Sequence, residues 1–380
     1  MRLSDVAVID KTKHMGELPY VGLEDISNAT GEFLGSYQSR SMKSTTFQFT
    51  SKHVLYGRLR PYLNKALLPD FEGHCSSEIF PIRPNKDLDR RYLFYWLTWP
   101  ETCNRIAATE TGARMPRANM KEVMAFDIPL PPLDEQKRIV AVLDQAFAAL
   151  DRARAFIETN LADAKSLFME ALGRRVATQI DNYGSIKVDQ LSEHITDGDH
   201  QAPPKVDTGV PFITISNIEK SSRRIDFTKT FYVPRTYYEK LSPKRRPNYG
   251  DILYSVTGSF GIPVLVKNYP EFCFQRHIGL IRPNEYTNSD WLHFMLMSPQ
   301  CFEQADAAAT GTAQRTVSLK ALRALQVPDT PPQEQSRIAS EISQLYGVCF
   351  ERVAQYELKL KDLEELRRSV LNRAFSGQLS

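Results

Sequence analysis

The sequence lacks the short motifs by which common nucleotide, metal and cofactor sites are recognised. It contains no GxxxxGK[ST], GxGxxG, HExxH or paired CxxC pattern. It also lacks the Asn-Pro-Pro-Tyr or Asp-Pro-Pro-Tyr tetrad expected of an amino-methyltransferase. Seven histidines are scattered without ligand spacing. The sequence therefore predicts no catalytic residue, no cofactor site and no metal site in this chain.

Long apolar runs and strong charge are also missing. No run approaches the roughly 18 residues needed to span a membrane, and the first residues show no signal-peptide pattern. A net charge of +3 permits nucleic-acid binding but argues against holding DNA by charge alone. The five cysteines are scattered, which favours buried thiols in a reducing cytoplasm over disulfides or zinc. We therefore expect a cytoplasmic protein, with room for two domains in 380 residues.

An internal repeat with an offset of 199 residues is the strongest positive signal. Residues 128–139 are repeated as residues 327–338. The first segment contains Pro-Pro-Leu-Asp-Glu-Gln, and the second contains Pro-Pro-Gln-Glu-Gln. Ile82-Arg83-Pro84-Asn85 recurs as residues 281–284, and Thr111-Gly112 recurs as Thr310-Gly311. A period this long indicates domain duplication rather than a solenoid.

Each proline cluster opens a long helical pattern, because proline is tolerated in the first helical turn. Apolar residues then recur every three or four positions, which is typical of a narrow coiled-coil seam. The seam includes Ile139, Val142, Leu150, Ile157, Leu161, Ile338, Ile342, Leu345, Tyr356, Leu360 and Leu363. Gly173 and Gly377 are the expected helix ends.

Helices of roughly 58–65 Å are too long for one small domain to cover. We expect the two helices to pair antiparallel within the chain, with dimerisation between chains as the alternative.

The remaining segments predict two mixed α/β units. We assign residues 1–128 and 186–328 to globular domains, 129–173 and 329–380 to the long helices, and 174–185 to a connector. Short strands are expected around residues 47–57 and 251–266, and one helix in each unit, at 90–108 and at 289–308. The expected fold class is α+β, with two pseudo-repeated domains joined by an antiparallel coiled coil.

Basic residues interleaved with aromatic residues suggest contact with DNA phosphates. In the first unit, residues 33–69 contain no Asp or Glu. The candidates there are Arg40, Lys43, Arg58, Arg60, Tyr62 and Lys65, and in the second unit they are Lys220, Arg223, Arg224 and Arg276. A solvated basic surface is the alternative for both clusters, and it is the usual explanation for a basic cluster in a loop such as that of the second unit.

Two loops at equivalent positions, residues 111–117 and 310–316, are the candidates for reading bases. Arginine can pair with guanine and glutamine with adenine in the major groove. The candidate residues are Arg114, Arg117, Thr312, Gln314 and Arg315, joined by Thr257 and Ser259 from the glycine-containing segment 255–261. An ordinary turn after a helix is the alternative for each loop.

On these residues the chain resembles the specificity subunits of type I restriction-modification systems. The resemblance lies in the duplicated Pro-Pro…Glu-Gln element, and in Gly250-Asp251-Ile252-Leu253 with Gly258-Ser259-Phe260-Gly261. It spans essentially the whole chain, although the first unit has His53-Val54-Leu55-Tyr56 in place of Gly-Asp-Ile-Leu.

The resemblance implies a non-catalytic, sequence-specific DNA-binding subunit. Each domain would read half of a bipartite target on double-stranded DNA, while the helices set the spacing and dock two methyltransferase subunits. Those partners would bind S-adenosylmethionine and methylate adenine N6, and a restriction subunit, if present, would use ATP and Mg. A stand-alone coiled-coil DNA-binding regulator, and an enzyme without a recognised motif, are the alternatives.

Overall fold

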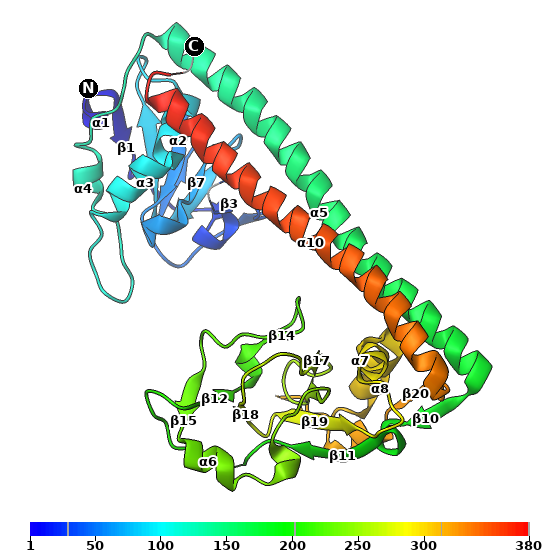
Figure 1. Cartoon of the computed structure of the whole chain (residues 1–380). Coiled ribbons are helices and arrows are strands. Elements are labelled where there is room, and N and C mark those ends of the chain that lie inside the picture. The colour runs from blue at the N-terminus through cyan, green and yellow to red at the C-terminus, as the bar shows by residue number, and fades with distance from the viewer. Residues whose placement is uncertain (29, 201–202, 313, 379–380) are drawn as a thin grey trace. The chain divides into compact units, whose positions relative to one another are not determined.

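The computed structural model describes residues 1–28, 30–200, 203–312 and 314–378. It divides into two compact units, Met1–Glu158 with Glu357–Ser380, and Thr159–Tyr356 (Figure 1). The long helices α5 (Leu133–Tyr183) and α10 (Pro332–Phe375) each contribute one half to each unit. Ala313, in the second candidate loop, lies outside the described residues.

Unit 1 contains two small sheets. One has the order β1-β9-β6-β7 and is antiparallel throughout; the other has the order β2-β5-β8-β3-β4, with β3 and β8 parallel. Its strands are β1 (Ala7–Ile9), β2 (Lys13–His14), β3 (Leu18–Val21), β4 (Ser39–Arg40), β5 (Thr46–Phe49), β6 (Val54–Gly57), β7 (Ala66–Leu67), β8 (Gly73–Ser76) and β9 (Ile79–Pro84). Its short helices are α1 (Leu3–Val6), α2 (Arg90–Thr98), α3 (Pro100–Ala107) and α4 (Met120–Val123).

Unit 2 repeats this plan. Its main sheet has the order β11-β19-β16-β17, and its second sheet, β15-β12-β18, again contains a parallel pair, β12 with β18. The strands are β10 (Ser185–Lys187), β11 (Ser192–Asp197), β12 (Val210–Ile213), β13 (Ile218–Glu219), β14 (Arg224–Ile225), β15 (Phe231–Val233), β16 (Ile252–Ser255), β17 (Pro263–Leu265), β18 (Cys273–Phe274), β19 (Ile278–Pro283) and β20 (Gln326–Pro328). The short helices are α6 (Arg235–Lys240), α7 (Ser289–Met297), α8 (Pro299–Ala308) and α9 (Leu319–Ala324).

The two main sheets match strand for strand, which confirms the duplication and the α+β class. In each unit the hydrophobic core joins the main sheet, a helix pair and one end of both long helices. The single helix predicted in each unit is wrong in one respect, because a proline divides it. Pro100 begins α3 and Pro299 begins α8, since proline disfavours helical backbone in the residue before it.

The predicted end of the first long helix at Gly173 is also wrong. Helix α5 continues to Tyr183 and takes in most of the expected connector, 174–185. Glycine inside a helix costs only about 1 kcal/mol, and the Gly173 carbonyl accepts a hydrogen bond from Gln300 Nε2 at 2.7 Å. Gly184 ends the helix instead, with φ of 77° and its N–H bonded to Ile180 O at 2.8 Å. Gly377, with φ of 76°, follows α10 as predicted.

The long helices pair antiparallel within each unit (Figure 1). In unit 1, Arg154 Nη2 lies 2.7 Å from Glu364 Oε1, and Arg367 Nη1 lies 3.1 Å from Asp151 Oδ1. In unit 2, Arg175 forms an ion pair with Glu341, and the rings of Phe168 and Tyr346 are 5.1 Å apart. In both units the residue numbers of the partners rise along one helix and fall along the other. The prediction of intramolecular antiparallel pairing is confirmed.

The predicted seam is correct at most positions. The seam residues that are at least half-buried are Ile139, Val142, Leu150, Ile157, Leu161, Ile338, Ile342, Tyr356, Leu360 and Leu363. Leu345 is wrong: it is exposed, and its neighbour Tyr346 packs inward against Phe168 and Phe294. Both residues are apolar enough for the seam, and the large aromatic ring fills the space between the other two rings.

A buried glutamine fixes the start of each long helix. Gln136 accepts from the Asp89 N–H at 2.8 Å and donates to the carbonyls of Asp87 and Pro131, each at 2.9 Å. Gln335 accepts from the Asn288 N–H at 2.8 Å in the same way. Asp89 and Asn288 are the N-caps of α2 and α7. The glutamine of each Glu-Gln pair therefore connects the start of a long helix to the globular domain of the same unit.

Candidate nucleic-acid interface

The first candidate loop is closed by a pair of backbone hydrogen bonds. Thr111 and Arg117 exchange N–H···O bonds of 3.0 Å in each direction, so the residues between them form a short protruding loop. Gly112 adopts φ of 94°, which glycine reaches without strain. The loop is fastened to the segment after β6, because Arg60 N donates to Pro116 O and Ala118 N to Arg58 O, both at 2.8 Å.

The second candidate loop has the same frame. Thr310 and Thr316 exchange backbone bonds of 3.0 and 2.8 Å, and Gly311 has φ of 104°. It is fastened to the segment after β16, since Gly258 N donates to Arg315 O at 3.0 Å and Val317 N to Val256 O at 2.8 Å. The two units therefore present one backbone arrangement with different side chains.

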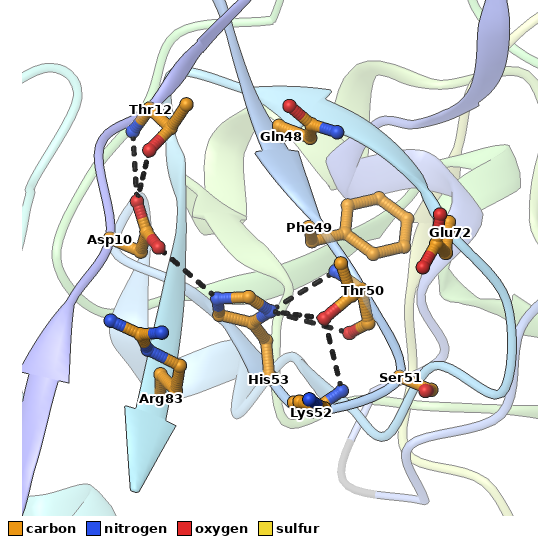
Figure 2. Close-up of a pocket in the computed structure, with 10 residues that line it drawn as sticks. All are labelled: Asp10, Thr12, Gln48, Phe49, Thr50, Ser51, Lys52, His53, Glu72 and Arg83. Atoms are coloured by element: carbon orange, nitrogen blue, oxygen red, sulfur yellow. Dashed lines mark hydrogen bonds and ion pairs between the residues drawn. The ribbon is translucent and has the colours of Figure 1, made fainter.

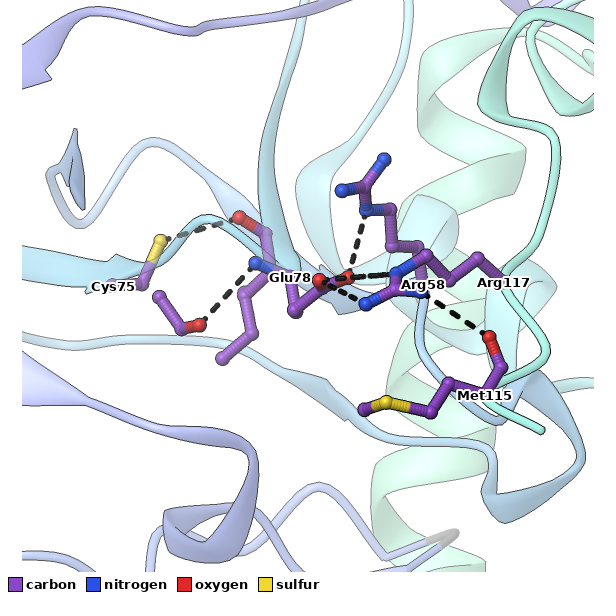
Figure 3. Close-up of polar contacts among 7 residues, drawn as sticks. Arg58, Cys75, Glu78, Met115 and Arg117 are labelled. Atoms are coloured by element: carbon purple, nitrogen blue, oxygen red, sulfur yellow. Dashed lines mark hydrogen bonds and ion pairs between the residues drawn. The ribbon is translucent and has the colours of Figure 1, made fainter. Parts of the chain in front are cut away.

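Glu78 joins the end of the first loop to the segment after β6 (Figure 3). Its carboxylate accepts from Arg58 Nε at 3.0 Å and from Arg117 Nη2 at 2.9 Å. Partial burial alone would raise the pKa of Glu78, but the guanidinium groups of Arg117 and Arg58 outweigh it and hold the pKa below its usual range. Arg58 and Arg117, predicted to contact DNA, thus already have a carboxylate partner and act first as positioning residues.

The outward-facing candidates in unit 1 are Arg60, Tyr62 and Arg114. All three are exposed, and Tyr62 lies in a 3-10 turn, Pro61–Leu63, directly beside the loop. Within the described residues, neither Arg60 nor Arg114 forms a side-chain hydrogen bond or an ion pair. Their guanidinium groups are free to meet a ligand.

In unit 2 the exposed candidates are Ser259, Thr312 and Gln314, which lie on the loop and on the segment to which it is fastened. Arg315 is exposed, but its Nη1 lies 2.6 Å from Asp306 Oδ1 and its guanidinium stacks over Phe260. Thr257 is buried against Thr316, so it supports the loop from below.

Arg276 is exposed on the connection between β18 and β19. It lies beside the same segment, because Val256 N donates to His277 O at 3.0 Å.

Three candidates of unit 1 belong to other surroundings. Arg40 lies on β4 and stacks over the Tyr20 ring at 4.4 Å, and Lys43 is exposed in the connection that follows. Lys65 donates from Nζ to Leu23 O at 2.6 Å, so it ties two segments of unit 1 together.

The cluster Lys220, Arg223 and Arg224 lies on the β13–β14 hairpin. Lys220 is exposed, and Arg224 stacks over Phe350 of α10. Arg223 is half-buried, with φ of 52°, and its Nη1 is shielded from solvent. Burial lowers the pKa of this guanidinium, although nearby Tyr346 and Tyr254 partly oppose the effect. The structure therefore places Arg223 as a support between the hairpin and α10 rather than on an exposed surface.

Comparison with known proteins finds the same family of domain in both units. The family model for the type I restriction modification DNA specificity domain matches residues 2–155 and 199–361, one region for each unit. The chain belongs to this DNA specificity domain family. The matched regions include both candidate loops, so the specificity domain occurs twice in the chain.

Curated relatives of the family share limited identity with this chain. The type I restriction enzyme EcoDI specificity subunit of Escherichia coli is 29% identical over 181 residues, covering 46% of this chain and 40% of the relative. The EcoBI specificity subunit of Escherichia coli is 23% identical over 314 residues, covering 76% of this chain and 65% of the relative. This chain therefore spans between two fifths and two thirds of the length of these relatives.

Solved structures show that the specificity fold extends over the whole chain. A chain from a structure describing complex assembly and conformational transition of the type I R-M system has a TM-score of 0.78 and 21% identity, covering 100% of this chain and 97% of that one. The HsdS subunit from Thermoanaerobacter tengcongensis has a TM-score of 0.55 and 21% identity, covering 100% and 96%. Both likenesses confirm the fold.

The Gly-Asp-Ile-Leu motif of this specificity chain has a structural explanation. Asp251 is buried and accepts from Arg282 Nε at 2.9 Å and Nη2 at 2.7 Å. At the matching positions unit 1 has His53 and Arg83. His53 Nε2 lies 3.5 Å from Asp10 Oδ2 instead, and both line a cavity of about 380 Å³ with Arg83 (Figure 2). The first unit thus keeps the sheet but replaces the ion pair that fastens it.

Sequence reasoning missed two groups that hold the specificity domain together. Glu78 is an isolated acid in the sequence, and only the fold brings it between Arg58 and Arg117. The roles of Gln136 and Gln335 could be suspected from their repetition, but their partners could not. In the described part of the chain, no helix is long and apolar enough to cross a membrane.

Proposed function

We propose that this chain is the DNA-reading, non-catalytic subunit of a type I restriction-modification complex. Each unit reads one half of a bipartite target on duplex DNA through its protruding loop. The observation that carries the proposal is the repeated loop frame, Thr111 to Arg117 and Thr310 to Thr316, with different side chains on each copy. Two copies of one frame with different outward residues are suited to reading two different base sequences.

The paired helices support a second role as a docking surface. Unit 1 exposes the apolar side chains Phe156, Leu358 and Leu366 on α5 and α10, and unit 2 exposes Leu167, Leu345 and Val348. Apolar side chains left in water along a helix pair are typical of protein interfaces. One methyltransferase subunit would bind the helix pair of each unit, which gives two per chain.

The partner subunits would supply the chemistry. Those bound to the helices would carry S-adenosylmethionine and methylate adenine N6. A restriction subunit, where one is present, would bring ATP and Mg for translocation and cleavage. The sequence of this chain carries no motif for either cofactor, which agrees with this division of roles.

The direct test is co-expression with the methyltransferase encoded beside it, followed by mapping of methylated adenines. We expect a bipartite motif that requires both chains. Exchanging residues 111–117 for the loop of a relative should change one half of the motif and leave the other half as an internal control. Methylation by this chain alone would refute a non-catalytic role, and a change in both halves would refute the assignment of one loop to one half.

A stand-alone dimeric regulator fits the structure less well. Its coiled coil would need a free apolar seam on each chain. In both units α5 and α10 already face each other along that seam, through Arg154 with Glu364 and through Phe168 with Tyr346.

A further inference from the structure

Arg60 has a backbone conformation that an arginine rarely adopts. Its φ and ψ are 51° and 62°, in the left-handed region. A side chain in that region brings Cβ close to the neighbouring carbonyl oxygen, so residues other than glycine, asparagine and aspartate are uncommon there. Arginine is therefore an unfavourable residue for the left-handed backbone conformation at position 60.

The second unit shows which residue the backbone favours. Gly258 occupies the position of Arg60, because each donates its N–H to the matching carbonyl of its loop, Arg315 O and Pro116 O. Gly258 has φ of 70°, so the same left-handed turn is present in both copies. One copy has the unstrained residue and the other has an arginine.

Among the residues whose structure is described, no internal contact accounts for the arginine at position 60. Asn64, the other left-handed residue of this segment, donates from its buried side chain to Thr98 O at 2.9 Å and so stabilises the fold. Arg58 and Arg117 bind Glu78. The side chain of Arg60 is exposed and, in the described part of the chain, has no hydrogen-bonding or ionic partner. A strained residue without a structural role indicates a functional one.

We propose that Arg60 reads a guanine in the half-site recognised by unit 1. The inference rests on the proposed function. Arginine presents a planar fork of donors that pairs with guanine O6 and N7 in the major groove. The 2.8 Å bond from Arg60 N to Pro116 O fixes the root of this side chain to the reading loop. Unit 2, with Gly258 at this place, makes no side-chain contact with the corresponding base pair.

The test uses the full complex of this chain with its methyltransferase subunit. The variants are Arg60→Gly, Arg60→Lys and Arg60→Asn, with Lys86→Gly as a control that removes one positive charge from an exposed turn of the same unit. Binding is measured against duplexes that each carry one altered base pair of the mapped motif. Adenine methylation is mapped for each variant, and the thermal midpoint is recorded.

We expect Arg60→Gly to relax one G·C position of the first half-site by about 10- to 100-fold in discrimination, with the second half unchanged. Its thermal midpoint should stay equal or rise, because glycine relieves the strained turn. Arg60→Lys should lose discrimination as well, since a lysine lacks the fork. Lys86→Gly should retain the full motif.

An Arg60→Gly complex that keeps full discrimination would overturn the proposal while leaving the proposed function intact. A uniform loss of affinity across all duplexes, with a shallower salt dependence, would also overturn it, because that result identifies a phosphate contact. If Arg60→Gly folds poorly, Arg60→Asn gives the same reading, since asparagine tolerates this conformation. A wild-type complex without any bipartite motif would refute the proposed function itself.

Discussion

Replacing Gln136 by leucine should loosen the joint between α5 and its domain. The side chain is fully buried and makes three hydrogen bonds, to the N–H of Asp89 and to the carbonyls of Asp87 and Pro131. Leucine fills a similar volume but leaves all three groups without a partner. Each unsatisfied buried group costs about 1–3 kcal/mol. Because Asp87 is exposed and can bind water, we expect a total of about 2–4 kcal/mol.

Hydrogen exchange followed by mass spectrometry can locate this effect. Peptides covering α2 and the first turns of α5 should exchange about 30- to several hundred-fold faster, since each 1.4 kcal/mol corresponds to a factor of ten. Peptides of α7 and the start of α10 in unit 2 serve as an internal reference. Gln335→Leu should reverse the pattern, because that side chain makes the matching bond to Asn288 N.

Gln145→Leu is the matched control, because Gln145 is exposed on the same helix. It should leave exchange in both sets of peptides unchanged. If Gln136→Leu behaves like Gln145→Leu, the buried glutamine does not fasten the helix and the explanation of the Glu-Gln repeat fails.

Three further outcomes follow from the structure. Burial lowers the pKa of His293 to about 4, so the unfolded chain takes up this proton at a higher pH than the folded chain does. The free energy of unfolding measured in urea should therefore fall by about 3 kcal/mol as pH falls from 6.5 to 4. The variant His293→Gln, which lacks the titrating ring, should not show this loss. Glu78→Gln should lower unfolding free energy by about 1–2 kcal/mol and weaken recognition of the first half-site alone, because Arg58 and Arg117 lose their shared partner; equal weakening of both halves would contradict this. Inserting four residues into both long helices at the boundary between the units adds about 6 Å, so the mapped spacer should lengthen by one or two base pairs; an unchanged spacer would show that the helices do not set it.

The duplication was readable because its signals are local. The prolines, the Glu-Gln pair and the glycines at 112 and 311 each meet a requirement of the backbone at their own position. The helix end at Gly173 was not readable in the same way. Glycine both ends helices and sits inside them, and here a contact from Gln300, 127 residues away, accompanies the second arrangement.

The candidate site was predicted as a region rather than residue by residue. Within each unit the loop and the segment beside it do come together, but a count of basic residues cannot show which of them are already paired. Arg117 and Arg114 look alike in the sequence, yet among the described residues Arg117 has a carboxylate within reach and Arg114 has none. Arg223 looked like a surface cation and is half-buried beside Tyr254 and Tyr346. These distinctions depend on long-range contacts that no local pattern records.

The hydrogen bonds that Gln136 and Gln335 make at the starts of the long helices join neutral amides to backbone groups and involve no charged group. Contacts to DNA phosphates weaken as salt rises, and exposed ion pairs such as Arg154 with Glu364 are screened as well. A buried amide with fully formed hydrogen bonds is indifferent to ionic strength. At a salt concentration that weakens contacts to DNA, these bonds therefore still hold the start of each long helix to its domain, and the geometry that the proposed reading of DNA requires is retained.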